Sequence, residues 1–144
     1  MATHALVVDD VGHYEGLAVA EHLANSGAKV TMVTRLPTLA PDVRPALMVD
    51  PALERLGSKD FTYHVGTRVL KTDGQSATLE PTTGGERWTI NADQLVFVSL
   101  NRPRVELIEH LEARKLPYTL VGDAHSPRFL VRAVAEGNTA GRSV

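Results

Sequence analysis

The 144-residue sequence contains no cysteine. This absence excludes disulfide bonds, thiolate catalysis and cysteine-held iron–sulfur clusters within these residues, and it favours a cytoplasmic location. No apolar run approaches the roughly 18 residues that a membrane-spanning helix needs, and the start, Met-Ala-Thr-His, lacks the pattern of a signal peptide. The formal net charge is only −2 and no basic run occurs, which argues against nucleic acid as a partner.

The composition is that of a globular domain, with 43% hydrophobic and 22% charged residues. A single domain of this length buries about 70% of the surface that its unfolded chain exposes, so it needs no covalent or metal cross-links. The first apolar run begins at Ala5, almost at the first residue. Such a start fits both a short natural protein and a domain excised from a longer one.

Residues 5–35 organise the rest of the chain. The apolar run 5–8 predicts a strand buried on both faces, and 16–25 carries apolar side chains at helical spacing. Gly27 suits the left-handed conformation just past a helix end, and 30–33 predicts a second strand. A strand–helix–strand unit of this kind is parallel, and the loop after its first strand meets the helix N-terminus, where free N–H groups attract anions. We therefore look first for a ligand at the loop between Asp9 and Glu15.

The remaining pattern predicts a three-layer, Rossmann-like α/β fold with a mostly parallel sheet and an antiparallel three-stranded meander covering one side. Further parallel strands are expected at 61–65, 94–100 and 118–121, and meander strands at 67–72, 77–81 and 86–91. Helices are expected at 43–57 with a break at Pro51, at 104–115, and at 127–140 after the capping pair Ser126-Pro127.

Two motifs carry a resemblance to a known family. The first is Asp-Asp-x-Gly-x-Tyr-x-Gly at 9–16 followed by Ala20-Glu21, and the second is Gly-Asp-Ala-x-x-Pro-Arg at 122–128. Over nearly its whole length the chain resembles the C-terminal part of the flavin oxidoreductases of the trimethylamine dehydrogenase and 2,4-dienoyl-CoA reductase family. The resemblance implies an NAD(P)-binding-like domain at 1–121, with the meander at about 66–91. It implies that 122–144 re-enters a separate FAD/ADP-binding fold.

The resemblance also implies cofactors and partners. NAD(P)H or ADP would bind in this domain, whereas FMN and a 4Fe-4S cluster would be held only by upstream domains that this sequence lacks. The partners would be the upstream barrel and the FAD/ADP-like domain of the parent enzyme, or a second copy of the chain docked through helix 127–140. No catalytic and no metal-binding residue is expected here. The candidate cofactor-binding residues are Asp10, Gly12, Tyr14, Gly16, Arg35, Gly122, Asp123 and Arg128.

The first loop departs from a dinucleotide fingerprint. Gly-x-Gly-x-x-Gly provides a tight turn and a close approach to the pyrophosphate, but only Gly12 and Gly16 are present. Asp9 and Asp10 place two carboxylates where a pyrophosphate would lie, and like charges at ~4 Å repel by several kcal/mol in a partly shielded site. Arg35 stands where NADP-binding folds often hold the 2′-phosphate. Two functions therefore stay open: nucleotide binding, and a non-catalytic scaffold that has lost it.

A third interpretation is a response-regulator receiver domain, in which Asp9 and Asp10 would hold Mg²⁺ beside a phosphoacceptor, Asp50, at the end of an apolar run. The meander and the absence of a lysine after the last predicted strand argue against it. The simpler expectation is that Asp9 and Asp10 cap the first loop in solvent. Likewise, Tyr14 is expected to pack on the meander rather than to gate a nucleotide, and Glu21 to lie on a solvated helix face. The six histidines show no metal-ligand spacing.

Overall fold

The computed structural model describes residues 3–143, which divide after Leu100 into two compact units. The first unit holds two sheets. The parallel sheet has the order β3-β2-β1-β7. Its strands are β1 (His4–Asp9), β2 (Lys29–Thr34), β3 (Phe61–His64) and β7 (Gln94–Val98). Val8 on β1 lies beside Val33 on β2 in parallel register, so the predicted strand–helix–strand crossover is confirmed.

The antiparallel sheet is the predicted meander. It consists of β4 (Thr67–Thr72), β5 (Ser76–Pro81) and β6 (Trp88–Asn91), in that order. Tight turns connect its strands, and Gly74 and Gly84 adopt the positive φ values that turns of this kind require.

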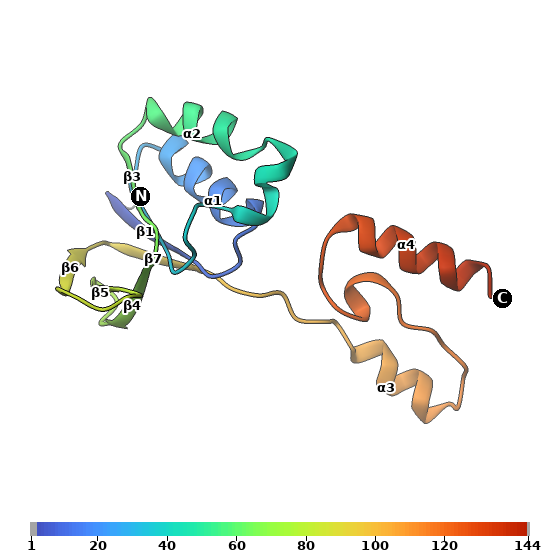
Figure 1. Cartoon of the computed structure of the whole chain (residues 1–144). Helices are drawn as coiled ribbons and strands as arrows, with labels where there is room; N and C mark the ends of the chain where they lie inside the picture. Colours follow the sequence, from blue (N-terminus) through green and yellow to red (C-terminus); the bar gives the residue numbers. More distant parts are fainter. Residues whose placement is uncertain (1–2, 144) are drawn as a thin grey trace. The chain divides into compact units, whose positions relative to one another are not determined.

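The two faces of the parallel sheet have different covers. Val7 and Met32 face the helix side, where they pack with side chains of α1 (Tyr14–Asn25) and α2 (Val49–Gly57). Leu6 and Val33 face the other side and pack against β5 of the meander. Figure 1 shows the helices and the meander on opposite faces of the sheet. Because successive side chains of a strand point to opposite faces, one apolar strand supplies both cores, and the three-layer prediction is confirmed.

The end of α1 follows the sequence prediction. Gly27 has φ +89° and its N–H donates to the carbonyl of Ala24. The N–H of Ala28 donates to the carbonyl of Leu23, which satisfies another free carbonyl of the last turn. The start of α1 is earlier than predicted, at Tyr14, so Gly16 lies inside its first turn.

The predicted helix 43–57 is wrong in its first half. Pro41–Ala46 forms a 3-10 helix, η1, flanked by Ala40 and Leu47 in the left-handed conformation. The α-helix α2 then begins at Val49, so the break lies before Pro51 rather than at it. Proline is tolerated in a first turn because its missing N–H would have had no partner there.

The second unit contains α3 (Glu106–Ala113), the 3-10 turn η2 (Gly122–Ala124) and α4 (Leu130–Gly141). The predicted strand 118–121 is wrong: these residues form no strand. Ser126 does not cap a helix, because α4 starts later, after Phe129. No residue from 101 to 143 is buried. None of the helices formed by residues 3–143 has the length and hydrophobicity that crossing a bilayer requires.

Candidate functional site

The loop between β1 and α1 is built around the carboxylate of Asp9, which is 0% exposed. Its Oδ1 accepts hydrogen bonds from the backbone N–H groups of Val11, at 3.0 Å, and Gly12, at 3.2 Å. Its Oδ2 is buried and has no hydrogen-bond partner among the described residues. Burial raises the pKa of Asp9, and the nearby charges of Asp10 and Glu15 add to this effect. The expectation of a cap is confirmed, whereas the expectation of a solvated side chain is wrong for Asp9.

The two loop glycines have different structural roles. Gly12 has φ +78°, and a Cβ there would stand 2.5 Å from Leu36 Cδ1 and 3.3 Å from the ring of Pro41. Its carbonyl accepts the N–H of Asp42, at 3.0 Å, so the segment after β2 covers it. A Cβ on Gly16 would stand 2.9 Å from Asp9 Oδ2. At both glycines, therefore, atoms of this chain lie close to the position that a Cβ would take.

Asp10 and Arg35 form an exposed ion pair. Arg35 Nε lies 3.2 Å from Asp10 Oδ1, and about half of each side chain is exposed. The guanidinium predicted to receive a 2′-phosphate therefore faces a carboxylate of the chain itself. A phosphate would have to compete with that carboxylate for the same cation.

Tyr14 belongs to a cluster that connects the two helices. Its hydroxyl donates to Glu21 Oε2 at 3.3 Å and accepts from Arg55 Nη2 at 3.2 Å. Arg55 Nε lies 2.5 Å from Glu21 Oε1, and this interaction raises the pKa of Arg55. The ring packs against the helix-side core, so the expected contact with the meander is wrong. Glu21 is part of this cluster rather than a solvated residue.

The other three predicted site residues lie in the second unit, and two of them, Gly122 and Arg128, bond to Glu136. The N–H of Gly122 donates to Glu136 Oε2 at 2.9 Å, and Arg128 Nη2 donates to Glu136 Oε1. The hydrogen bond from Gly122 is the main cause of a lowered pKa of Glu136, and His125, 3.5 Å away, adds to it. Asp123 is exposed. Gly122 and Arg128 are thus brought together by an internal carboxylate.

The arrangement of the acidic residues does not match a receiver domain. Asp50 lies in the first turn of α2, not at the end of a strand, and its carboxylate is 3.8 Å from Arg44. Among residues 3–143, no group of three or more potential ligand side chains could hold a metal ion.

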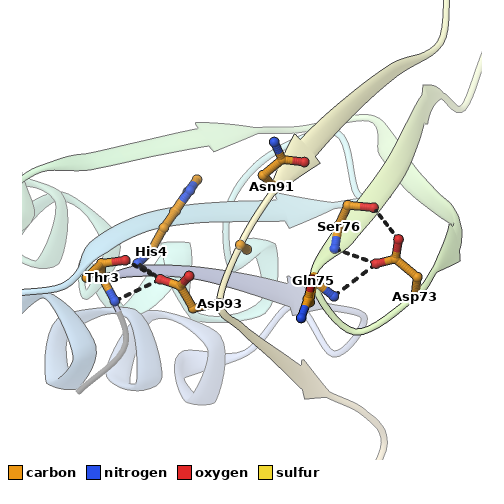
Figure 2. Close-up of a pocket in the computed structure, with 8 residues that line it drawn as sticks. Thr3, His4, Asp73, Gln75, Ser76, Asn91 and Asp93 are labelled. Atoms are coloured by element: carbon orange, nitrogen blue, oxygen red, sulfur yellow. Dashed lines mark hydrogen bonds between the residues drawn. The ribbon is translucent and has the colours of Figure 1, made fainter.

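A separate pocket of 770 Å³ lies at the opposite end of β1 (Figure 2). Asp93 accepts the N–H groups of Thr3 and His4, and the hydroxyl of Thr3, and these bonds lower its pKa. Asp73 accepts the N–H groups of Gln75 and Ser76, which likewise lowers its pKa. Asp73 therefore caps its own turn, whereas Asp93 holds the start of β1. In open parallel sheets ligands bind at the carboxyl ends of the strands, and this pocket is at the amino end of β1.

Three residues that matter at these sites were absent from the sequence-predicted set: Asp9, Arg55 and Glu136. Strand alternation could have identified Asp9, because it lies two residues after Val7 and so points to the same helix-covered face. No comparable signal exists for Arg55, which is 34 residues from Glu21.

No protein-family model and no curated protein matches this sequence. Among solved structures, histamine dehydrogenase from Rhizobium sp. 4-9 is similar with a TM-score of 0.89 and 23% identity, over 99% of this chain and 23% of that chain. The 6-hydroxypseudooxynicotine amine oxidase HisD from Pseudomonas geniculata N1 is similar with a TM-score of 0.87 and 24% identity, over 96% of this chain and 22% of that chain. A 2-naphthoyl-CoA reductase is similar with a TM-score of 0.77 and 17% identity, over 97% of this chain and 21% of that chain. These likenesses show a shared fold, and the chain spans less than a quarter of each of these oxidoreductases.

Proposed function

We propose that this chain is the nucleotide-fold scaffold domain of a flavin-dependent oxidoreductase of the trimethylamine dehydrogenase and 2,4-dienoyl-CoA reductase family. Its task is to dock the neighbouring domains and support electron transfer in them, without binding a dinucleotide itself. The motifs at 9–16 and 122–128 favour this family, and so does the similarity to a dehydrogenase, an oxidase and a reductase.

The main observation against nucleotide binding is that side chains of the protein itself occupy the β1–α1 loop. Asp9 occupies the N–H groups of Val11 and Gly12, which a pyrophosphate would need. Leu36 and Pro41 cover Gly12, so a phosphate cannot approach its Cα as closely as the dinucleotide fingerprint requires. The geometry therefore favours the scaffold over the nucleotide-binding alternative.

Titration of the purified chain with NADH, NADPH and ADP tests the proposal. A ligand at 100 times its Kd would stabilise the folded state by about 2.7 kcal/mol, so binding would be visible as a rise in melting temperature. We expect no saturable change in NADH fluorescence and no such rise at millimolar ligand. Saturable binding would reject the scaffold. NADPH binding that Arg35→Ala weakens, with NADH binding unaffected, would establish instead an NADP-type site.

The second unit supports the docking part of the proposal. Leu130, Val131 and Val134 of α4 are 79%, 70% and 62% exposed. Since no residue from 101 to 143 is buried, this unit has no core of its own to offset the entropy of folding. We assign residues 122–144 to the re-entry into an FAD/ADP-like fold, whose surface would cover α4. The other candidate cover is a second copy of the chain.

Light scattering combined with hydrogen exchange distinguishes the two possible partners of α4, an FAD/ADP-like fold and a second copy of the chain. A concentration-dependent dimer in which the amides of α4 become protected would support the second copy. A monomer at all concentrations, with α4 amides exchanging fast, would support an FAD/ADP-like fold. That fold, added as part of a longer protein, is then expected to slow the exchange of α4.

A further inference from the structure

We propose that the β1–α1 loop is an oxyanion site whose occupant is the Asp9 carboxylate of the chain itself, and that removing this carboxylate leaves a site for a small external oxyanion. The inference deepens the proposed function, on which it rests, because it gives the reason why the loop binds no nucleotide.

The first step is the location. Asp9 is the last residue of β1. Its Oδ1 binds two loop N–H groups that precede the 12-residue helix α1, and its Oδ2 lies beside Gly16 in the first turn of that helix. The N–H groups of a first helical turn have no partner within the helix, and the helix dipole adds positive potential there. A carboxylate at this point occupies the position that an anionic ligand takes in a nucleotide-binding fold.

The second step is the hydrogen bonding. Oδ1 receives two backbone N–H groups, from Val11 and Gly12, as an oxygen of a bound phosphate would. Asp10 is exposed and pairs with Arg35, so the adjacent aspartate does not share this position. Asp9 and Asp10 can therefore be compared directly: they are neighbouring carboxylates, and only Asp9 lies in the loop interior.

The third step is the second oxygen. Oδ2 is buried without a partner, against the backbone of Gly16. Burying an unpaired carboxylate oxygen costs free energy, and a cap needs only the one oxygen that accepts the two N–H groups. Because Gly16 has no Cβ, it leaves the space that this second oxygen occupies, so the loop accommodates a whole carboxylate rather than a single acceptor.

The test uses Asp9→Ala, whose missing carboxylate leaves a gap the size of formate. We expect sodium formate to raise the melting temperature of Asp9→Ala saturably, with an affinity at least tenfold that for the wild type. The amide resonances of Val11 and Gly12 should shift in the same titration. Sodium chloride at equal ionic strength controls for screening. The double variant Asp10→Ala/Arg35→Ala removes the exposed carboxylate of the same loop together with the cation that it pairs with, and should gain no affinity.

The outcomes are distinct. If folded Asp9→Ala gains no more formate affinity than Asp10→Ala/Arg35→Ala, the inference is wrong, although the scaffold function stands. If Asp9→Ala is unfolded in chloride, folding on addition of formate supports the inference. Failure of formate to restore folding, while the neutral isostere Asp9→Asn folds, overturns it. Saturable NADH binding to the wild type would instead reject the proposed function itself.

Discussion

The carboxylate of Asp9 lies against the backbone of Gly16: a Cβ built on the glycine would stand 2.8 Å from Asp9 Cγ and 2.8 Å from Met32 Cε. Real Cβ atoms do not approach other atoms so closely, so Gly16→Ala must displace both of these groups. Overpacking of this kind costs typically 1–3 kcal/mol. We expect a loss of that size in the free energy of unfolding, measured by urea denaturation.

Gly57→Ala is the control for this substitution, because a Cβ on Gly57 would have no atom within 4 Å. Its effect should be zero or a stabilisation of up to about 1 kcal/mol, as expected for alanine in a helix. In the Asp9→Ala background the new methyl group has room on the side of Asp9. Gly16→Ala should then cost less, and an unchanged cost would mean that Met32 rather than Asp9 sets the constraint.

Tyr14→Phe tests whether this residue connects helices or gates a ligand. The substitution removes the hydroxyl that bonds to Glu21 and Arg55 and keeps the ring. We expect a loss of about 0.5–1.5 kcal/mol in unfolding free energy, the usual net value of a lost hydrogen bond. Tyr63→Phe is the control, because its side chain is 48% exposed, and it should be neutral. Equal effects of the two substitutions would contradict the helix-connecting role.

The parts of the fold that sequence predicts well are those in which local pattern and tertiary environment agree. β1, α1 and β2 combine apolar periodicity with a glycine stop at Gly27, and the meander has its own turn residues, so each local preference matches the final structure. The run at 118–121 has the same strand propensity but no strand of the described chain pairs with it. Strand propensity is a preference for a pleated, half-buried surface, and sequence does not reveal whether such a surface exists.

The candidate site was predictable in position but not in occupancy. The loop after β1 is where parallel crossovers bind anions; Gly12 lies in this loop and Gly16 in the first turn of α1 that follows it. Whether the N–H groups of Val11 and Gly12 bind a ligand or a side chain depends on which of the two aspartates, Asp9 or Asp10, points into the loop. That choice is fixed by the pleat of β1 and by the room beside Gly16. The covering of Gly12 by Leu36 depends on the fold of a different segment and has no local signal.

Glu80 should make stability fall at acid pH. It is 6% exposed and lies between Arg68, at 2.8 Å, and Arg87, at 3.1 Å. The hydrogen bonds from Arg68, and next from Arg87, hold its pKa below the ordinary 4.5. An acid with a lowered folded pKa stabilises above its unfolded pKa, and this stabilisation is lost as pH falls through the folded pKa.

Glu80→Gln should therefore be less stable than the wild type at neutral pH, with a difference that shrinks as the pH falls below 4.5. Thermal melting at a series of pH values measures this difference. Glu86→Gln, at an exposed position of the same meander, should follow the wild-type curve throughout. A Glu80→Gln deficit that persists at acid pH would show that packing, not charge, is responsible.

Asp9 should act in the opposite direction, because burial raises its pKa above the ordinary 3.8. Between 3.8 and the raised value the folded chain binds more protons than the unfolded chain, so its stability falls as the pH rises through that window. Asp9→Asn keeps an oxygen for the N–H groups of Val11 and Gly12 and cannot ionise. Relative to the wild type, this variant should gain stability as the pH rises above 3.8, as measured by urea unfolding. Asp10→Asn, at an exposed position, should show no such gain. A wild type that becomes more stable than Asp9→Asn with rising pH would mean that the hydrogen bonds from Val11 and Gly12 outweigh the cost of burying the charge.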